Sequence, residues 1–435
     1  MKNLATPIKI RELQRKLYCK AKAEPAFRFY QLYDKIWRED ILAHAWALAR
    51  ANRGAPGVDG IDFEVIEIGG LESWLKGLQE ELREKRYKPS AVRRVMIPKA
   101  GGGERPLGIP TIKDRVVQTA AKLVLEPIFE ADMEPSAWGY RPKRSALDAV
   151  KVVHEALIEG YTQVVDADLS KYFDTIPHDD LMRSVTLRIV DRAVLALLKS
   201  WLQAPVQSED PSGSGGSRMS GGKHHKLGTP QGGVISPILA NRYMNRFLRY
   251  WEQSPKAQAL ETKIVAYADD FVILARSQNK AQKALGLARG AMQKLKLEIN
   301  EAKTSVCNAR AERFNFLGYS FGLHYNQRTG RTYLGASASD KSVQRCKDKI
   351  SAMLNTTPQA WEEVCAKLNR MLKGWENYFQ HGSKRKSYRA INAHVRTRVR
   401  NFLQRRHKVS SRGTRQFSHA HIFGDLGVHQ LSGRK

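Results

Sequence analysis

The stretch Ile264-Val265-Ala266-Tyr267-Ala268-Asp269-Asp270-Phe271-Val272-Ile273-Leu274 decides the fold, because it sets two adjacent carboxylates between two apolar runs. Both runs are rich in β-branched and aromatic residues and have the length of buried strands, whereas Ala-Asp-Asp is typical of a turn. The stretch therefore predicts a β-hairpin with Asp269 and Asp270 at its tip. Like charges this close need a compensating cation or solvent, and hard oxygen ligands suit Mg²⁺. An acidic turn facing water is the alternative, and for an isolated Asp-Asp pair it is the simpler interpretation.

A second acidic strand end occurs earlier, in Val164-Val165-Asp166-Ala167-Asp168-Leu169-Ser170-Lys171-Tyr172-Phe173-Asp174. Alternation along a strand puts Asp166 and Asp168 on one face. The alternative role for Asp168 is an N-cap for the helix or turn that follows. Two strand ends that both present carboxylates are suited to clamp two Mg²⁺ ions about 4 Å apart, as in-line displacement at phosphorus requires. The two acidic strand ends together indicate such a metal site far more specifically than either one alone.

The charge composition indicates a polyanionic partner. The 435 residues include 73 Lys and Arg against 43 Asp and Glu, a formal net charge of +30. Hydrophobic residues make up 42% of the chain and charged residues 27%, which is ordinary for a globular protein with two or three domains. A phosphate backbone is the natural partner for the excess of cations, and a basic protein indifferent to RNA is the minor alternative.

The basic residues concentrate near the C-terminus. No acidic residue occurs between Glu376 and Asp425, and the aromatic residues Trp375, Tyr388 and Phe402 lie beside or among the cations. Such a run predicts nucleic-acid binding, because simple solvation would have left some Glu among the cations. The cations are Lys384, Arg385, Lys386, Arg389, Arg396, Arg398, Arg400, Arg405, Arg406, Lys408, Arg412 and Arg415.

The cysteines and the N-terminus indicate a cytoplasmic bacterial protein. Cys19, Cys307, Cys346 and Cys365 are scattered without a C-x-x-C pair, which disfavours both a zinc site and a disulfide framework. The basic N-terminus lacks the apolar core of a signal peptide, and we expect no membrane span. The pair His224 and His225 lacks a further ligand at metal-site spacing, so we expect a solvated hairpin tip there.

Periodicity predicts helices and short strands along the rest of the chain. Helices are expected between 12 and 52, and at 71–85, 114–129, 146–158, 181–202, 280–294, 342–354, 358–379 and 388–404. Strands are expected at 92–98 and 105–109, joined by the turn Gly101-Gly102-Gly103, and at 297–300 and 315–321.

These motifs resemble the reverse transcriptases encoded by bacterial group II introns, over nearly the whole chain. The resemblance rests on Tyr267-Ala268-Asp269-Asp270, on the segment around Asp168, and on Thr229-Pro230-Gln231-Gly232-Gly233-Val234-Ile235-Ser236-Pro237. Four further segments follow the family's order. The N-terminal extension motif is similar to Arg53-Gly54-Ala55-Pro56-Gly57-Val58-Asp59-Gly60, and the fingers are similar to Ile97-Pro98-Lys99 through Asp114-Arg115. The primer grip is similar to Phe316-Leu317-Gly318-Tyr319, and the maturase thumb to Gly374-Trp375-Glu376-Asn377-Tyr378-Phe379.

The resemblance implies an α+β right-hand polymerase: fingers and palm with an antiparallel sheet, then an α-helical thumb and a basic C-terminal segment. The implied domains are an N-terminal extension at 1–60, reverse transcriptase fingers and palm at 61–335, a maturase or thumb (X) domain at 336–390 and a basic DNA-binding (D) segment at 391–435. The paired cysteines and histidines of the family's endonuclease are missing, so we expect no endonuclease domain and a primer from another source.

The resemblance also assigns roles. Asp168, Asp269 and Asp270 would be catalytic and hold two Mg²⁺ ions, Asp270 more as a support, with the backbone carbonyl of Leu169 as a further ligand. The nucleotide-binding residues would be Lys99, Arg105, Phe173, Gln231 and Lys303. Phe173 would exclude a 2′-hydroxyl; its alternative role is a core aromatic. Lys99 and Arg105 have an exposed basic hairpin as their alternative.

The primer grip would be Phe316, Leu317 and Gly318, although a plain strand and turn fits as well. Nucleic-acid contacts would come from Arg53, Arg396, Arg398, Arg400, Arg405 and Arg406.

The implied function is an RNA-directed DNA polymerase that binds its group II intron RNA, assists splicing and copies the intron into DNA for retrohoming. Its partners would be the intron RNA, an RNA template with a DNA primer, a deoxynucleoside triphosphate (dNTP) and target DNA. Two alternatives stay open. One is an intron-independent reverse transcriptase of DNA repair or defence, and the other is a maturase that only assists splicing.

Overall fold

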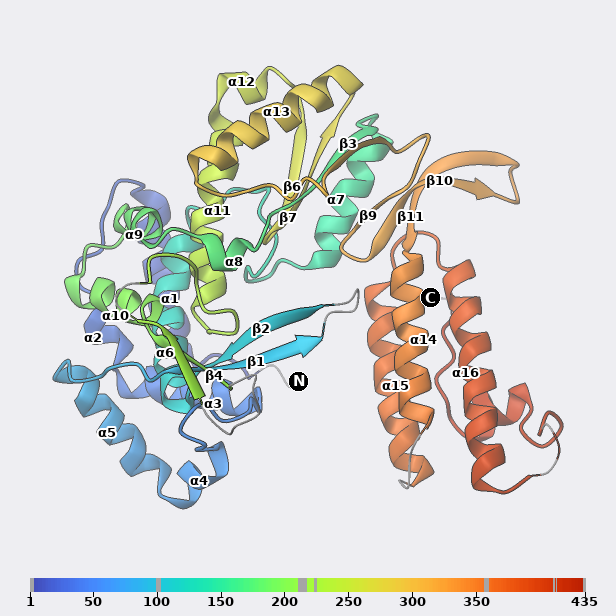
Figure 1. Ribbon diagram of the computed structural model, residues 1–435, viewed down its shortest axis with the longest axis horizontal. Coiled ribbons are helices and arrows are strands. Elements are labelled where there is room, and N and C mark those ends of the chain that lie inside the picture. Colours follow the sequence, from blue (N-terminus) through green and yellow to red (C-terminus); the bar gives the residue numbers. More distant parts are fainter. Residues whose placement is uncertain are drawn as a thin grey trace.

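A computed structural model of the chain describes residues 4–98, 103–209, 217–222, 225–355, 360–409, 411 and 413–432 (Figure 1). Its helices are α1 (Ile8–Ala23), α2 (Tyr33–Ile36), α3 (Glu39–Ala51), α4 (Phe63–Ile68), α5 (Leu71–Arg83), α6 (Ile112–Glu130), α7 (Ala146–Ile158), α8 (Tyr172–Thr175), α9 (His178–Thr186), α10 (Arg192–Leu202), α11 (Ser236–Gln253), α12 (Pro255–Gln258), α13 (Gln278–Lys294), α14 (Asp340–Asn355), α15 (Trp361–Tyr378), α16 (Arg385–Arg406) and the π-helix η1 (His421–Asp425). Its strands are β1 (Val92–Pro98), β2 (Glu104–Ile109), β3 (Gln163–Asp168), β4 (Pro205–Glu209), β5 (Ser217–Gly221), β6 (Lys263–Tyr267), β7 (Asp270–Ala275), β8 (Ser305–Asn308), β9 (Phe314–Phe316), β10 (Tyr319–Asn326) and β11 (Arg331–Ala338).

The central sheet is antiparallel, with the strand order β6-β7-β3-β8. Both of its faces are covered, so its strands read as continuous apolar runs. Val164, Val265 and Val272 pack toward α7 and the strands β9 to β11, whereas Val165 and Phe271 pack toward the core that contains α6, α11 and α13. This double cover explains why both acidic motifs follow apolar runs without alternation.

Two further sheets flank the central one. The N-terminal sheet has the order β2-β1-β4-β5, in which β1 and β4 pair in parallel and the other strands pair antiparallel. The third sheet has the order β11-β10-β9. The predicted antiparallel pairing of the strands β1 and β2 is confirmed, whereas Gly101 and Gly102 of the predicted turn lie outside the described residues; helix α7 has the predicted bounds. The fold is therefore a mixed α and β structure with antiparallel sheets.

Two predicted strands are wrong. Residues 315–321 do not form one strand, because the chain turns back at Leu317 and Gly318, both with positive φ (50° and 79°), and pairs β9 with β10. Residues 297–300 do not form a strand either; Ile299 makes only an isolated bridge to Leu169. Sequence periodicity missed the turn because a leucine is rare in the left-handed region.

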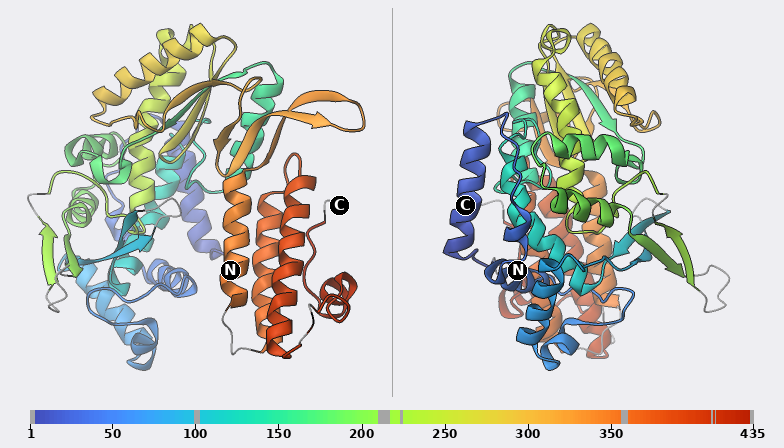
Figure 2. Two further views of the ribbon diagram at one scale, coloured as in Figure 1. Left: turned by 45° about the vertical axis from the view of Figure 1, so that its right-hand side comes forward. Right: turned by 90° about the vertical axis from the view of Figure 1, so that its left-hand side faces the viewer.

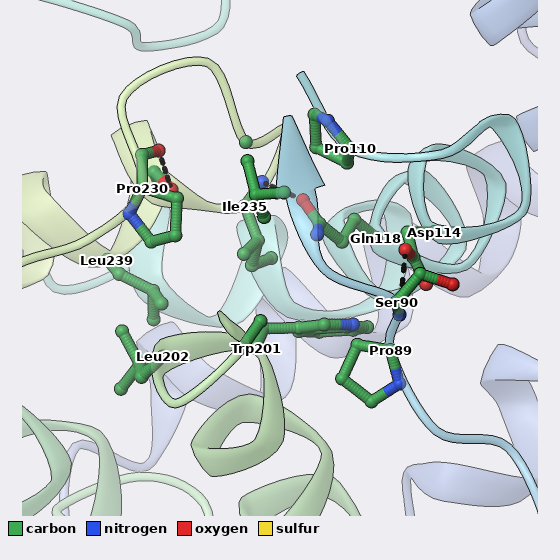
Figure 3. A pocket seen from close by; sticks show the side chains of 14 residues that line it. Pro89, Ser90, Pro110, Asp114, Gln118, Trp201, Leu202, Pro230, Ile235 and Leu239 are labelled. Carbon is green, nitrogen blue, oxygen red and sulfur yellow. Dashed lines mark hydrogen bonds between the residues drawn. The ribbon is translucent and has the colours of Figure 1, made fainter. Parts of the chain in front are cut away.

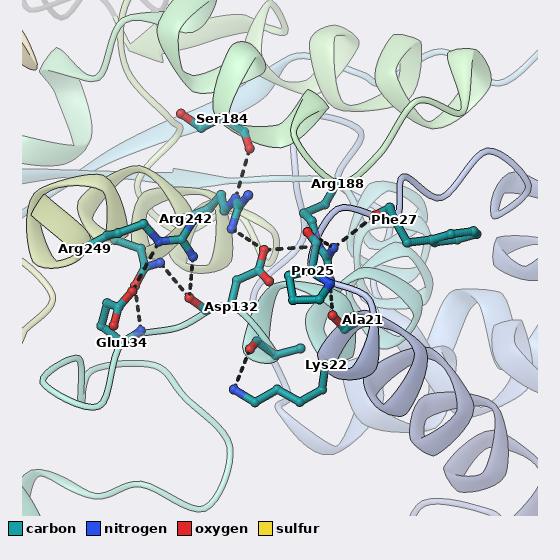
Figure 4. A network of polar contacts seen from close by, with 12 residues as sticks. Ala21, Lys22, Pro25, Phe27, Asp132, Glu134, Ser184, Arg188, Arg242 and Arg249 are labelled. Atoms are coloured by element: carbon teal, nitrogen blue, oxygen red, sulfur yellow. Dashed lines mark hydrogen bonds and ion pairs between the residues drawn. The ribbon is translucent and has the colours of Figure 1, made fainter. Parts of the chain in front are cut away.

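The N-terminal helices share one core with the central sheet, and Arg188 anchors them (Figure 4). The Arg188 guanidinium donates hydrogen bonds to the carbonyl oxygens of Glu24, Pro25 and Phe27, at 2.9, 2.5 and 3.0 Å, and one more to Ala21. Its Nε lies 3.2 Å from the Asp132 carboxylate, which also pairs with Arg242 at 2.9 Å. Arg188 is only 2% exposed. One buried guanidinium thus ties residues 21–27 to the helices α9 and α11.

The helices α14, α15 and α16 form a separate C-terminal bundle with its own core, into which Phe417, Ile422, Val428 and Leu431 also pack. Helix α16 runs through the expected boundary between residues 390 and 391. Residues on both sides of this boundary therefore belong to one folding unit. Among the described residues, no helix has the length and hydropathy of a membrane span.

Replacing Arg188 by alanine removes the buried anchor and leaves several carbonyl groups without their donor. We expect the free energy of unfolding to fall by about 3–5 kcal/mol, as measured by urea denaturation. The control is Arg183→Ala on α9, whose side chain is 78% exposed in its ion pair with Asp180; this loss is expected to be under about 1 kcal/mol. Equal losses in the two variants would contradict the anchoring role.

Candidate active site

The two acidic motifs meet at one end of the central sheet. The register of β3 with β7 puts Asp168 opposite Asp270, and β6 and β7 are joined by a two-residue turn of Ala268 and Asp269. Directly opposed residues of an antiparallel pair have Cβ atoms about 4.5–5.5 Å apart. The predicted hairpin is confirmed, and the carboxylates from both motifs gather around one point.

The hairpin turn is supported from behind by the loop 136–141, a feature that the sequence did not reveal. Ala268 has a positive φ of 57°. Trp138 N donates to Ala266 O at 2.8 Å, and a Cβ on Gly139 would lie 2.6 Å from Ala268 N. Asn241 Nδ2 in turn donates to Gly139 O at 2.7 Å. The glycine thus permits a close approach that holds the strained turn in place.

The gathered carboxylates repel one another, and their pKa values are shifted accordingly. Burial, followed by the charges of Asp269 and Asp168, raises the pKa of Asp270 to about 7. Burial and then Asp168 raise the pKa of Asp166 to about 6. Burial also raises the pKa of Asp269, against the cations Arg105 and Lys303. The site therefore holds more negative charge than its own cations balance.

Lys303 supplies the nearest compensating charge. Its Nζ lies 2.7 Å from Asp168 Oδ2, and Asn300 Nδ2 donates to the same oxygen at 3.4 Å. Asn300 N also donates to Asp168 O at 2.8 Å, which fixes the loop after α13 against the end of β3. The hydrogen bond to Asp168 and its charge raise the pKa of Lys303. Asn300 is a site residue that the sequence analysis missed.

The donor set fits a divalent cation, because hard carboxylate oxygens with unbalanced charge are what such ions bind. Within the described ranges, no three acidic, imidazole or thiol side chains are already arranged as ligands of one ion. One Asp168 oxygen, Oδ2, is turned to the Lys303 ammonium group.

The carboxylates open into a cleft of about 850 Å³ between the central and N-terminal sheets. Arg105 Nε donates to Gln231 Oε1 at 2.8 Å, and Gln231 Nε2 donates to Asp174 Oδ2 at 2.9 Å. These two hydrogen bonds connect β2 with α8 across the cleft, and we call them the relay. The sequence motifs contained Asp174, but nothing in the sequence indicated its partner.

The loop that carries Gln231 is pinned to β2 through glycine. Gly108 N donates to Gln231 O at 2.5 Å, and a side chain on Gly232 (φ 107°) would clash with the Gly108 carbonyl oxygen. Figure 3 shows the packing beneath this loop, where Gln118 Oε1 accepts from Ile235 N at 3.4 Å and Ser236 Oγ donates to Pro230 O at 2.8 Å. The hollow there holds only about 10 Å³, so it supports the loop and cannot admit a ligand.

Phe173 lies in α8 and is 6% exposed, yet it lines the cleft. Its ring meets the edge of Tyr140 at a centroid distance of 6.5 Å, and Tyr140 in turn lies 6.4 Å from Tyr267. Burial, then the charge of Asp269, raises the pKa of Tyr140. Tyr140 was not among the predicted site residues, although it lies between the hairpin and Phe173.

The predicted primer-grip residues lie where the third sheet meets the C-terminal bundle. The Phe316 side chain is 3% exposed in the core. Tyr378 OH donates to Leu317 O at 2.7 Å, and Ser342 Oγ donates to Gly318 O at 2.9 Å. The turn of Leu317 and Gly318 is therefore held by α14 and α15.

The remaining predicted residues are spread over the surface. Lys99 lies outside the described residues. Arg53 is exposed in the loop after α3 and has a positive φ of 47°. On α16, Arg396 lines one groove and Arg398 and Arg405 line another, and Arg405 donates to Leu354 O at 2.8 Å. Arg400 and Arg406 also belong to α16.

Comparison with known proteins agrees with this arrangement. Residues 97–321 match the reverse transcriptase (RNA-dependent DNA polymerase) family, and residues 343–419 match the group II intron, maturase-specific domain. The chain therefore belongs to the reverse transcriptase family and carries a group II intron maturase-specific domain. The family generally uses divalent metal ions.

Individual relatives match large or small parts of the chain. Protein YkfC of Escherichia coli K12 is 32% identical over 380 residues, which cover 79% of this chain and 96% of YkfC. The group II intron-encoded protein LtrA of Lactococcus lactis is 28% identical over 357 residues, 67% of this chain but only 56% of LtrA. Nuclear intron maturase 1 of Arabidopsis thaliana is 31% identical over 94 residues, 22% of this chain and 13% of that protein.

The relay across the cleft makes a specific prediction for Asp174→Asn. A carboxylate can only accept, so it forces Gln231 to offer its NH₂ to Asp174 and its oxygen to Arg105. The NH₂ group of an asparagine at position 174 can donate to the Gln231 side-chain oxygen and so compete with Arg105 for it. We expect the KM for dNTP to rise about tenfold in steady-state primer extension, since a hydrogen bond to a charged group contributes about 1.5 kcal/mol. The exposed Asp179→Asn is the control, and an unchanged KM in Asp174→Asn would contradict the relay.

Proposed function

We propose that this reverse transcriptase binds the RNA of a group II intron, assists its splicing and copies it into DNA for retrohoming. The observation that carries the proposal is the pairing of Asp168 with Asp270 beside Asp269, in a cleft that Arg105 bounds from the opposite sheet. The maturase-specific match and the likeness to LtrA, named as a group II intron-encoded protein, support an intron RNA as partner.

The reaction would be attack of a primer 3′-hydroxyl on the α-phosphate of a dNTP, with release of pyrophosphate. Two Mg²⁺ ions, when bound, would activate the hydroxyl and neutralise the leaving group. Asp168, Asp269 and the backbone carbonyl of Leu169 would hold them. Asp270 would support the site, consistent with its raised pKa, which burial and then the charges of Asp269 and Asp168 cause.

The nucleotide would be bound from both sides of the cleft. Arg105 would grip the triphosphate through its bidentate fork, together with Lys99 as a point charge. Gln231 would meet the sugar or phosphate from its pinned loop. Lys303 would leave Asp168 when a cation takes its place and turn to the pyrophosphate.

Phe173 would lie beneath the sugar and exclude a 2′-hydroxyl, so that DNA is the product. Tyr140 supports this role, because its edge-on contact keeps the Phe173 ring in one orientation. The primer end would be positioned by the turn of Leu317 and Gly318, while the buried Phe316 holds the turn from the core.

The division of the chain follows from these roles. Residues 1–60 would form the N-terminal extension with Arg53, residues 61–335 the fingers and palm, and residues 336–390 the thumb. Residues 391–435, with Arg396, Arg398, Arg400, Arg405 and Arg406, would contact target DNA although they fold together with the thumb. The excess of basic residues over the whole chain suits these nucleic-acid partners.

The alternatives receive less support. A maturase without polymerase activity has no need of the relay from Arg105 to Asp174 or of a hairpin held in strain. An intron-independent enzyme would not need a maturase-specific domain, which residues 343–419 match.

Replacing Asp269 by alanine is expected to abolish primer extension on an RNA template with Mg²⁺ while RNA binding stays nearly intact. The physical reason is that the ligand set loses a carboxylate whereas the basic surfaces are untouched. Extension by purified protein and RNA affinity by filter binding measure the two effects. Exposed Glu363→Gln on α15 serves as the control, and measurable extension by Asp269→Ala would remove the catalytic assignment.

Phe173→Ala is expected to admit ribonucleotides, because the ring that would meet the 2′-hydroxyl is removed. The ratio of kcat/KM for dNTP to that for the matching ribonucleotide should fall at least tenfold, in single-nucleotide incorporation. Tyr172→Phe is the control, since it keeps the neighbouring ring and removes only its hydrogen bond to Ala240 O. An unchanged ratio would refute the proposed role of Phe173 in excluding a 2′-hydroxyl.

A further inference from the structure

One wall of the cleft is made by two stretches of chain that run side by side. The loop that leads from β5 to α11 passes beside α8 (Figures 1 and 2). Residues 226–231 of this loop lie antiparallel to residues 173–178, and we call the two stretches the paired segments. Backbone hydrogen bonds join them, from Thr229 N to Phe173 O at 2.6 Å, from Gly228 N to Ile176 O at 2.8 Å and from His178 N to Lys226 O at 2.9 Å.

A side-chain hydrogen bond closes each end of the paired segments. At one end Gln231 Nε2 donates to Asp174 Oδ2 at 2.9 Å, as part of the relay. At the other end His178 Nε2 lies 2.6 Å from Gly228 O. His178 is only 7% exposed, and its ring meets that of His225 edge-on at a centroid distance of 5.7 Å. The paired segments are thus held by buried side-chain contacts as well as by backbone bonds.

The Gly228 carbonyl fixes the position of the proton on His178. Burial lowers the pKa of His178, against the bond to Gly228 O and the charge of Asp179, and the neighbouring His225 lowers it further. The ring is therefore neutral at neutral pH and carries a single N–H group. Since a carbonyl oxygen can only accept, this N–H lies on Nε2 and donates to Gly228 O.

The close approach of the paired segments depends on glycine. Gly228 has a positive φ of 85°, and a Cβ there would lie 2.8 Å from Asp174 O. Phe173, Asp174 and Gly228 line the cleft, whereas His178 is not among the described residues that do so. His178 therefore contacts this wall of the cleft from behind.

We propose that His178 is a positioning residue for the incoming nucleotide. Its bond to Gly228 O fixes the distance between the Phe173 ring, to which we assign the sugar, and the Gln231 amide, which would meet the sugar or phosphate. His178 touches neither the nucleotide nor the carboxylates and acts through the paired segments. The inference rests on the proposed function and adds to it the buried group on which sugar selection depends.

A positioning role and a merely structural role predict different kinetics. A side chain that only stabilises the fold changes the amount of active enzyme, so kcat falls for every nucleotide and KM stays the same. A side chain that positions the nucleotide changes the KM for dNTP and the preference over the matching ribonucleotide, with little change in kcat. Thermal unfolding measures the structural contribution separately.

The test compares His178→Gln with His178→Asn in single-nucleotide incorporation on an RNA template with a DNA primer. The glutamine amide nitrogen can replace Nε2 as donor to Gly228 O, whereas the shorter asparagine puts its amide near the position of Nδ1. In His178→Asn the KM for dNTP should rise about fivefold, and the ratio of kcat/KM for dNTP to that for the ribonucleotide should fall about fivefold, as expected for one hydrogen bond. His178→Gln should stay within about twofold of wild type in both quantities.

Hydrogen exchange gives a readout that needs no activity. The amides of Gly228 and Thr229 bond across the paired segments. They should exchange faster than in wild type when His178 is replaced by asparagine, and at the wild-type rate when it is replaced by glutamine. In a Phe173→Ala background, which already lacks the ring, His178→Asn should lower the ratio no further.

The matched control is His44→Asn, the same substitution at another buried histidine. His44 is 6% exposed in α3, and its Nε2 has no hydrogen-bond partner among the described residues. It is also outside the described lining of the cleft. This variant should lower the melting temperature while the KM for dNTP and the ratio stay at their wild-type values.

Two results would overturn the inference. One is a His178→Asn variant whose KM, ratio and amide exchange change no more than those of His44→Asn. The other is a His178→Gln variant that behaves like His178→Asn, because the bond to Gly228 O would then not be the cause. Failure of wild type to extend a primer, or an unchanged ratio in Phe173→Ala, would instead count against the proposed function, and amide exchange would still decide the role of His178.

Discussion

The structure depends on the register between β3 and β7, which sets Asp168 opposite Asp270. A one-residue slip would turn every side chain of β3 to the other face and would remove Asp168 from its place opposite Asp270. The apolar cover on both faces of the central sheet prevents such a slip, because Val164 and Val165 belong to different cores. The hydrophobic packing of the sheet thereby fixes an arrangement of carboxylates that is unfavourable by itself.

That unfavourable arrangement is held by groups outside the sheet. The loop with Gly139 clamps the hairpin turn, and the loop with Asn300 and Lys303 caps the end of β3. Burial, followed by the charges of Asp269 and Asp168, raises the pKa of Asp270 to about 7. The strained backbone of this turn thus lies at the carboxylates to which we assign the chemistry.

The chain combines a rigid catalytic body with a separate bundle. Arg188 binds the N-terminal helices to the core of the central sheet. The C-terminal bundle has its own core and meets the rest around the turn of Leu317 and Gly318, through Tyr378 and Ser342, and also where His381 contacts His154 and Ser383 N donates to Ala336 O. This junction also anchors the ribbon of β10 and β11, so that the primer-grip turn, the ribbon and the start of α16 form one connected structure.

The sequence alone determined the acidic hairpin, the strand that ends at Asp168, most helices and the polyanionic character of the partners, because these depend on local periodicity, turn chemistry and charge. Its motifs also sufficed to identify the family. Only the tertiary structure decided that Asp174 holds Gln231, that Tyr140 packs on Phe173, and that the described residues of α14, α15 and α16 share one core. These contacts join residues far apart in the chain, and no local pattern encodes them. The sequence left a strand through residues 315–321 and a strand and turn at Phe316, Leu317 and Gly318 both open, and the structure decided for the turn, because hydrogen bonds from Tyr378 and Ser342 stabilise a backbone conformation that leucine by itself disfavours.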